Sequence, residues 1–296
     1  MQAVKIIPAR ELHPVPTMIS AGRFSRIVER AEACIKRIGE LIDQGYTCCS
    51  AVSFGKDSSV VLILMLEAIR RRVEAGVYVP PAFVSHADTA IENPAMATYA
   101  DAMITELEMY CARYSLPITV IKVQPSMTSS FAYATLGRGK LPVFAGASRS
   151  CSVDWKLRPQ QKALKQLLST LQSPGELVTF VGTRLSESTT RATNMRGRGE
   201  DEAGRLAINE HGSYNCSIIA DWEMEEVWEL LMACDAKRGG PYRTYVKNFN
   251  WCLELYKEAN EGVCAIITGD GGNKAACGSR FGCAWCTVTG ERDKSM

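Results

Sequence analysis

The chain lacks a long apolar run, because no segment supplies the roughly 18 uninterrupted apolar residues that a membrane-spanning helix requires. It also has almost no excess of one charge: 34 Lys and Arg residues are set against 32 Asp and Glu residues, and the net charge is +2. A global attraction to a polyanion is therefore excluded, and any contact with nucleic acid must come from a local patch. We expect a cytoplasmic protein with no membrane partner.

Cysteine, by contrast, is abundant, with 12 in 296 residues. That number is compatible with disulfides in a small secreted domain, but a chain of this length with 46% hydrophobic residues can bury its own core. We therefore interpret the cysteines as reduced thiols, some of which are ligands of a metal or a cluster.

Short apolar runs alternate with amphipathic stretches along most of the chain. The runs have the length of strands, and the longer stretches repeat apolar residues at helical spacing. Strands are expected at 47–53, 82–85, 118–123, 176–182 and 263–268, and helices at 24–44, 60–72, 94–114, 154–171, 222–234 and 248–261. This alternation predicts an α/β fold with an open, mostly parallel twisted sheet and helices on both faces. Residues 124–150 and 194–214 break the rhythm and are expected to form long loops.

A candidate phosphate loop follows the first expected strand and opens a helix. Unpaired backbone N–H groups and the positive end of the helix are suited to bind phosphate there. Gly55 lets the backbone approach a ligand closely, and Lys56 supplies charge. The hydroxyls of Ser53, Ser58 and Ser59 can donate to phosphate oxygens. The alternative is a strand-to-helix turn in which Ser and Gly are incidental.

This loop is not the common nucleotide-binding P-loop. The P-loop pattern needs Gly at position 50 and Ser or Thr at position 57, where this chain has Ser50 and Asp57. The order Ser-x-Gly-x-Asp-Ser instead resembles the PP-loop of the N-type ATP pyrophosphatases. The resemblance implies that the loop holds the β,γ-pyrophosphate of ATP while a nucleophile attacks the α-phosphorus. It also implies that Asp57 helps to place Mg²⁺ or the pyrophosphate.

The segment 85–89 carries His86 and Asp88 at the end of the second expected strand. Nucleotides bind at such strand ends in open parallel sheets. The segment resembles the Asp-Thr stretch that contacts ribose and adenine in the phosphoadenylylsulfate reductase branch of the superfamily. Both side chains can equally well just close a turn.

The segment 182–191 ends the fourth expected strand with Arg184, Glu187 and Arg191. It resembles the Gly-x-Arg-x-x-Glu-Ser stretch of the same reductase branch, which implies contacts with the nucleotide. An arginine at a strand end can bind a phosphate bidentately. The alternative is a surface salt bridge between Arg184 and Glu187. Trp222 and Trp228 also match that branch, and we interpret them as core residues.

Three cysteines lie within ten residues near the end of the sequence, at Cys277, Cys283 and Cys286. Their spacing lets turns present three sulfurs to one centre, and Cys151 is the candidate for a fourth ligand. By spacing alone, structural zinc is as good an interpretation as an iron–sulfur cluster. The end of the chain resembles the DndC and SspD families of DNA phosphorothioation sulfurtransferases, and this resemblance implies a [4Fe-4S] cluster.

The same resemblance implies a reaction and partners. ATP and Mg²⁺ bind across the strand ends, a DNA backbone phosphate is adenylated, and a sulfur donor charged by a cysteine desulfurase then displaces AMP. Lys56, Asp57 and Arg184 are the implied catalytic residues, acting by positioning and charge neutralisation. Other DNA phosphorothioation proteins are implied partners. Residues 191–205, with four arginines, are our candidate for contact with the DNA backbone. A solvated mobile loop explains the segment equally well, because Glu200, Asp201 and Glu202 dilute the charge.

The resemblance divides the chain into three parts. These are an N-terminal helical segment (1–45), the ATP pyrophosphatase domain (46–262), and a final strand with the cysteine-rich segment (263–296) packed on that domain. Three alternatives stay open: an adenylylsulfate or phosphoadenylylsulfate reductase, a tRNA thiolase, and a non-enzymatic sensor subunit that binds ATP and a cluster. A reductase needs a nucleophilic cysteine on a C-terminal tail, and no thiol follows Cys286 here.

Overall fold

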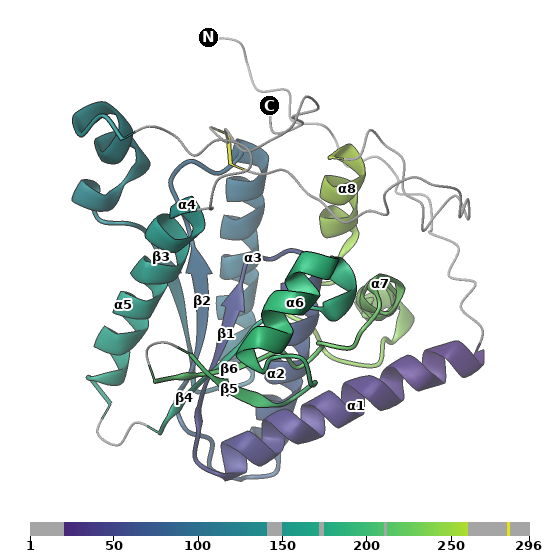
Figure 1. Ribbon diagram of the computed structural model, residues 1–296. Coiled ribbons are helices and arrows are strands. Elements are labelled where there is room, and N and C mark those ends of the chain that lie inside the picture. The colour runs from purple at the N-terminus through teal and green to yellow at the C-terminus, as the bar shows by residue number, and fades with distance from the viewer. Residues whose placement is uncertain (1–20, 141–149, 172–174, 210–211, 260–282, 285–296) are drawn as a thin grey trace.

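The computed structural model describes residues 21–140, 150–171, 175–209, 212–259 and 283–284. Its centre is a six-stranded sheet with the order β3-β2-β1-β4-β6-β5 (Figure 1). The strands are β1 (Thr47–Val52), β2 (Ala82–Ala87), β3 (Ile118–Val123), β4 (Leu177–Phe180), β5 (Leu206–Ile208) and β6 (Tyr214–Cys216). All neighbours pair in parallel except β5, which is antiparallel to β6 at the edge. The predicted open, mostly parallel α/β sheet is confirmed.

Helices connect most of these strands and follow the last of them. The longer ones are α1 (Ala21–Asp43), α2 (Lys56–Glu74), α3 (Pro94–Arg113), α5 (Arg158–Leu168), α6 (Thr189–Arg198), α7 (Met224–Ala233) and α8 (Asn250–Glu258). Short turns complete the set: α4 (Ser150–Ser152), η1 (Met127–Ser129), η2 (Tyr133–Gly137), η3 (Val153–Leu157), η4 (Leu185–Glu187) and η5 (Ala236–Arg238). Among the helices of the described ranges, none is both long and apolar enough to cross a lipid bilayer.

Helices pack on both faces of the sheet, as the alternation predicted (Figure 1). One face carries Cys49 and Phe83, which contact Leu164 of α5. The opposite face carries Cys48, Val84 and other residues of the main core, which α1, α2, α3, α7 and α8 cover. Side chains of a strand alternate between faces, so neighbouring Cys48 and Cys49 belong to different cores.

The start of α3 shows why the sequence pattern was informative. Asn93 caps the helix, because its side-chain oxygen accepts a hydrogen bond from the N–H of Ala95 at 2.9 Å. Pro94 occupies the first turn, where a helix needs no N–H donor from that residue. The predicted N-cap and first-turn proline are confirmed. Trp222 and Trp228 are each 1% exposed, which confirms them as core residues.

Two sequence expectations need correction. The segment 194–214 is not one long loop, because it contains the end of α6, the whole of β5 and the first residue of β6. The segment 124–150 is interrupted by η1 and η2. The expected strand at 263–268 lies outside the described residues, and the three-part division of the chain stays a prediction.

The strand order places a topological switch point between β1 and β4. From β1 the chain moves to β2 and β3 on one side, and then returns to add β4 and β6 on the other. Open parallel sheets bind ligands at the carboxyl ends of the strands where the order reverses. The loop after β1 and the loop after β4 meet at this point.

Candidate functional site

The loop after β1 has its left-handed residue at Phe54 and not at the glycine. Phe54 has φ 53°, whereas Gly55 is extended at φ −77° and ψ 168°. The Phe54 ring is fully buried, 5.4 Å from the His86 ring and 6.4 Å from the Tyr245 ring between centroids. The loop therefore has a buried aromatic anchor beneath it, which the sequence pattern did not reveal.

The serines of the loop have different roles. The Ser58 hydroxyl donates to the Gly55 carbonyl at 3.1 Å and accepts from the Ser53 N–H at 3.3 Å, which closes the loop on itself. Ser53 is exposed at the cleft described below. Ser59 is fully buried and is not among the residues that line this cleft. Ser53 and Ser58 are thus placed to meet a ligand, and Ser59 packs behind them.

Lys56 and Asp57 begin α2 and form an ion pair, with Lys56 Nζ 3.0 Å from Asp57 Oδ2. The Lys56 side chain is only 4% exposed, and its ammonium lies 4.9 Å from the centroid of the Tyr256 ring. The Lys56 backbone N–H donates to the Tyr256 hydroxyl at 3.3 Å. Tyr256 belongs to α8, so this helix holds the first residue of α2 in place.

Arg184 follows β4 and reaches the same carboxylate from the opposite side. Its Nε donates to Asp57 Oδ1 at 2.7 Å, and its Nη1 donates to Ser186 Oγ at 2.8 Å and to the Trp222 carbonyl at 3.2 Å. Arg184 is only 2% exposed. Two cations thus surround one carboxylate at the start of α2, which leaves a net charge of +1 beside the positive helix end.

Glu187 contacts Arg184 through the backbone. Its Oε1 accepts from the Arg184 N–H at 3.1 Å, and its Oε2 pairs with Arg191 one helical turn later. The expected alternative of a surface salt bridge between the Arg184 and Glu187 side chains is therefore wrong. Glu187 and Arg191 fix the loop that presents Arg184.

Gly182 is the point at which the two loops touch. A Cβ placed on Gly182 would lie 2.8 Å from the Ser58 nitrogen and 2.9 Å from the Asp57 carbonyl carbon, both backbone atoms that cannot turn aside. Only glycine lets the end of β4 approach the first turn of α2 this closely. The contact brings Arg184 within reach of Asp57.

An open cleft of about 900 Å³ runs over these groups. Its floor is the loop from Ser53 to Ser58 and the segment after β4, and its walls come from η3, α5, the start of α7 and Tyr256. Lys56, Asp57, Arg184, Glu187 and Arg191 all line it, so the structure brings these predicted site residues together. The hydrogen-bond donors, together with the cations Lys56 and Arg184 at the positive end of α2, fit a polyphosphate.

His86 and Asp88 lie at the carboxyl end of β2, beside Ser53 at a smaller hollow. His86 Nδ1 is 3.0 Å from the Val52 carbonyl, so this nitrogen carries the proton and donates. Asp88 accepts from the Ala90 N–H at 2.8 Å and from Gln124 at 2.9 Å, and pairs with Lys122 at 3.1 Å. These contacts close a turn, as one of the two interpretations expected. The expected contact with ribose or adenine stays a prediction.

The Asp88 carboxyl illustrates how this turn is stabilised. Burial by itself raises the pKa of Asp88. Hydrogen bonds from Gln124 and Ala90 and the ammonium of Lys122 outweigh burial, so the pKa lies below its ordinary value. Asp88 therefore stays ionised and holds the segment after β2 in one conformation.

Of the four predicted metal ligands, the structure describes Cys151 and Cys283, both partly exposed. Cys283 pairs with Glu92 in an antiparallel bridge, and the next N–H, of Ala284, donates to the Ile91 carbonyl at 2.8 Å. Cys277 and Cys286 lie outside the described residues. Within the described ranges, no group of three His, Cys, Asp or Glu side chains is arranged to hold a metal ion, so the four-thiol set stays a prediction.

The other described cysteines are buried inside the fold. They are Cys34, Cys48, Cys49, Cys111, Cys216, Cys234 and Cys252. Burial raises the pKa of the Cys48, Cys216 and Cys234 thiols to about 12 and that of Cys111 to about 11. Their interpretation as core residues is confirmed, while Cys264 lies outside the described residues.

The arginines proposed to contact DNA are mostly paired with carboxylates. Arg191 pairs with Glu187, Arg198 with Glu200 at 2.7 Å, and Arg205 with Glu202 at 3.3 Å. Their charge is therefore largely balanced locally. The segment 191–205 offers less free positive charge than its sequence indicated.

Several cleft residues were missed by the sequence analysis. Tyr256, Gln160, Ser186 and Glu223 line the cleft, but none of them was named as a site residue. Gln160 Nε2 donates to Ser85 Oγ at 3.0 Å and so ties α5 to β2. The only sequence signal for Ser186 was its place inside the segment 182–191. Tyr256 lies in a helix that the periodicity predicted, but nothing pointed to its contact with Lys56.

Similarity to solved structures is weak. The FMN adenylyltransferase of Candida glabrata, in complex with FAD and inorganic pyrophosphate, is 12% identical, with 71% of this chain and 59% of that chain covered and a TM-score of 0.39. The NAD⁺ synthetase of Burkholderia pseudomallei is 17% identical, with 77% and 89% covered and a TM-score of 0.36. The chain thus spans about three fifths of the length of the adenylyltransferase. TM-scores this low carry no functional argument. No curated protein matches the sequence.

Residues 47–244 match the phosphoadenosine phosphosulfate reductase domain. The match runs from the start of β1 to beyond α7, so it includes the loop after β1, Asp88, Arg184 and the two core tryptophans. It therefore covers the whole sheet and nearly all of the cleft. The chain belongs to the phosphoadenosine phosphosulfate reductase domain family, within the PP-loop ATP pyrophosphatase superfamily.

Proposed function

We propose that the protein is an adenylating ATP pyrophosphatase that activates a DNA backbone phosphate and supports its replacement by sulfur. One observation carries the ATP part: Asp57 lies between Lys56 and Arg184 at the start of α2, on the floor of the cleft. A carboxylate that pairs with two buried cations beside a helix N-terminus holds both positive charges at one place. The β,γ-phosphates of ATP bind there.

The residues of the cleft also fit Mg²⁺ held jointly with the nucleotide. Each oxygen of Asp57 accepts one charged donor, which leaves a second lone pair on each. Glu187 and Glu223 add carboxylates at the edge. Mg²⁺ is usually bound by one or two carboxylates together with substrate phosphates and water, and this set suits that arrangement. When bound, the ion would neutralise charge on the phosphates.

Pyrophosphate formation needs no covalent intermediate on the protein. A non-bridging oxygen of the acceptor phosphate attacks the α-phosphorus of ATP, the bond to the β-phosphate oxygen breaks, and pyrophosphate leaves. Lys56 and Arg184 hold the leaving group and offset the charge that builds up on it. The immediate product is an adenylated phosphate.

Sulfur transfer completes the proposed reaction. A persulfide sulfur supplied by a cysteine desulfurase attacks the adenylated phosphorus, and AMP leaves. A thiol reductant then cleaves the remaining sulfur–sulfur bond, which leaves sulfur in the place of one oxygen. This step rests on the resemblance of residues 282–288 to DNA phosphorothioation sulfurtransferases. The other proteins of that pathway are the proposed partners.

A [4Fe-4S] cluster is the proposed use of Cys151, Cys277, Cys283 and Cys286. Among the nine described cysteines, Cys151 and Cys283 are partly exposed and the others are buried, so these two thiols are accessible to a ligand. Cys283 adjoins Glu92, whose carboxylate accepts from Lys156 of the cleft at 2.9 Å. The cluster, when bound, supplies a site that can bind or relay sulfur.

The cluster has its own test. Protein purified without oxygen should contain iron and sulfide and absorb visible light, and Cys283→Ser and Cys151→Ser should each lose iron. The matched control is Cys111→Ala, a buried core thiol, which should keep it. Retention of zinc in place of iron would contradict the cluster.

Phosphoadenylylsulfate reduction is the second candidate, because the family match carries that name. This reaction would use the same phosphate loop as the proposed adenylation, but its product is sulfite. Sulfite released from phosphoadenylylsulfate or adenylylsulfate in the presence of a thiol would identify it.

Pyrophosphate release is the primary test. Purified protein with ATP and Mg²⁺ should release pyrophosphate faster with DNA than with tRNA or with neither. Asp57→Ala should abolish release, while Glu106→Ala, which removes an exposed carboxylate of α3, should not. Faster release with tRNA would favour a tRNA thiolase, and strong sulfite release would favour a reductase. Absence of release with any nucleic acid or partner would favour a sensor that binds ATP without turnover.

A further inference from the structure

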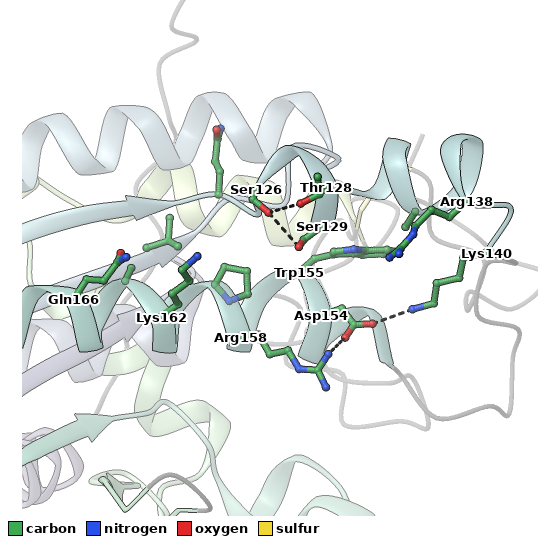
Figure 2. Close-up of a pocket in the computed structure, with 15 residues that line it drawn as sticks. Ser126, Thr128, Ser129, Arg138, Lys140, Asp154, Trp155, Arg158, Lys162 and Gln166 are labelled. Carbon is green, nitrogen blue, oxygen red and sulfur yellow. Dashed lines mark hydrogen bonds and ion pairs between the residues drawn. The ribbon is translucent and has the colours of Figure 1, made fainter.

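A second hollow of about 550 Å³ lies beside η3 and α5 (Figure 2). It is bounded by α5 on one side and by the segment from the end of β3 to η2 on the other. The turn at η1 presents three hydroxyls to it, from Ser126, Thr128 and Ser129. No residue of the proposed ATP site lines this hollow.

Four cations and one carboxylate surround the hollow. Lys140 and Arg158 share Asp154, at 2.9 Å and 2.7 Å. With four cations and one carboxylate, the group has a net charge of +3. Among the described residues, no carboxylate pairs with Arg138 or Lys162. Figure 2 shows Arg138 and Lys162 at opposite ends of the hollow. Arg138 lies 5.8 Å from the centroid of the Tyr133 ring, so its charge is not neutralised. Cations without a carboxylate partner, beside hydroxyl donors, are the groups that contact phosphodiesters in nucleic-acid interfaces.

An aromatic side chain lies between the cations. Trp155 is half-buried, and its ring packs edge-on against Phe131 with centroids 5.3 Å apart, which fixes its orientation. Figure 2 shows the indole between the hydroxyl-bearing turn and Asp154, with Arg138 beside it. A fixed aromatic ring within a basic groove is the usual stacking platform for a base of a single strand.

The basic surface continues along α5. Leu164, Leu167 and Leu168 pack this helix on the sheet, so Arg158, Lys162 and Lys165 face outward. Arg158 and Lys162 also border a further hollow of about 560 Å³ on the other flank of the helix. Eleven helical residues extend about 16 Å, which exceeds the span of one nucleotide. A basic surface of this length favours a polymeric ligand over a small anion.

The connection to the cleft is a single turn. Trp155 of η3 lines the hollow, while the next two residues, Lys156 and Leu157, line the cleft. A strand held on Trp155 therefore passes directly beside the proposed ATP site.

We propose that this hollow binds single-stranded nucleic acid, with phosphodiesters on Arg138 and Lys162 and a base stacked on Trp155. The site positions the acceptor strand, and its link to catalysis rests on the proposed function. It replaces the segment 191–205 as the main nucleic-acid contact.

The test measures binding of a labelled oligothymidylate of about 12 nucleotides, a length that one such groove accommodates. Fluorescence anisotropy is recorded over a range of salt for the full chain, for Arg138→Ala/Lys162→Ala, and for Arg26→Ala/Lys36→Ala. The last pair is exposed on α1 and removes the same charge. The hollow variant should bind about tenfold or more weakly, with a salt slope shallower by about 1.4, at about 0.7 per phosphate contact. The α1 variant should bind like the parent chain.

Substitutions of Trp155 test the contribution of base stacking separately from that of charge. Trp155→Ala should weaken binding about tenfold at unchanged salt slope, and Trp155→Phe should restore most of it. Circular dichroism and thermal melting show whether each variant folds. Binding of polyglutamate with the same dependence on Trp155, equal loss in the α1 variant, or a loss produced only by Arg196→Ala would overturn the proposal.

The release of pyrophosphate from ATP is measured in the same samples. Arg138→Ala/Lys162→Ala should lose stimulation by the strand and keep the release of pyrophosphate seen without it. Asp57→Ala should lose release and keep strand binding. A parent chain that releases pyrophosphate but binds no strand overturns this inference alone, whereas one that binds the strand and never releases pyrophosphate overturns only the proposed function.

Discussion

Arg184 Nε lies 2.7 Å from Asp57 Oδ1, although 127 positions separate the two residues in the chain. The contact joins the loop after β4 to the first turn of α2, across the switch point of the sheet. The same guanidinium also donates to Ser186 and to the Trp222 carbonyl, so three directions fix its plane. An ammonium group cannot reproduce this fork.

We expect Arg184→Lys to lower the rate of pyrophosphate release by on the order of 100-fold, because one preorganised charged donor at the leaving group is lost. The comparison is Arg243→Lys, an arginine that is 60% exposed and paired with Glu74, which should leave the rate unchanged. Steady-state pyrophosphate assays and thermal melts measure both. Equal rates for the two variants would contradict a role for Arg184 in the site.

Gly182→Ala should destabilise the protein by about 1–3 kcal/mol, because the added methyl group overpacks the contact with the backbone of Ser58. It should also weaken ATP binding, since the loop after β1 must shift. Gly197→Ala is the control: a Cβ at Gly197 meets nothing within 4 Å, and alanine favours the α6 helix. Urea unfolding and ATP titration of both variants test this. A stable Gly182→Ala protein with normal ATP affinity would show that the close approach is unnecessary.

The buried thiols should be unreactive in the folded protein. A pKa of about 12 for Cys48, Cys216 and Cys234 leaves only about one thiolate in ten thousand at pH 8. Cys151 and Cys283 should react before these buried thiols with iodoacetamide in metal-free protein, because both are partly exposed. Mass spectrometry before and after denaturation locates the modified residues. Rapid native labelling of Cys48 would mean that the sheet opens far more often than this packing implies.

Asp88 should make stability depend on pH in the acid range. Its folded pKa is depressed, so its contribution is fully present above the unfolded value of about 3.9 and is lost as the pH falls through the folded pKa. Asp88→Asn should therefore be less stable than the parent at pH 7, and the difference should shrink as the pH falls below about 4.

Asp101→Asn is the matched control for this effect. Asp101 also pairs with Lys122, but its side chain is 57% exposed. Urea unfolding at pH 7 should show a smaller loss of stability for this variant than for Asp88→Asn, because exposed ion pairs contribute little. A pH-independent loss in Asp88→Asn would mean that its charge is not what stabilises the turn.

Much of the fold could be predicted because long elements have periodic apolar residues and recognisable ends. The α3 helix has both signals, in Asn93-Pro94 and in its buried face. The β5–β6 pair has neither, since each strand has three residues and β6 depends on pairing with the distant β4. Strands that short show no period, and their neighbours decide their structure.

The candidate site was predictable where it consists of contiguous motifs. Ser53 to Ser58 and the segment around Arg184 are local patterns, and the strand order brings them together. Tyr256 was not predictable, because its contact with Lys56 joins residues 200 positions apart and depends on how α8 packs. The hollow beside Trp155 depends likewise on tertiary packing, because Arg138 and Lys140 follow η2 whereas Arg158 and Lys162 belong to α5.

The buried ring of Phe54 has a consequence for ATP affinity. Its left-handed backbone and its packing between His86 and Tyr245 fix the loop from beneath, on the side away from the ligand. The loss of conformational entropy that ordering this loop entails is therefore incurred when the protein folds, and not when the nucleotide arrives. In the proposed function, ATP therefore meets a loop that is already ordered, and its binding free energy remains available for orienting the α-phosphorus toward the acceptor.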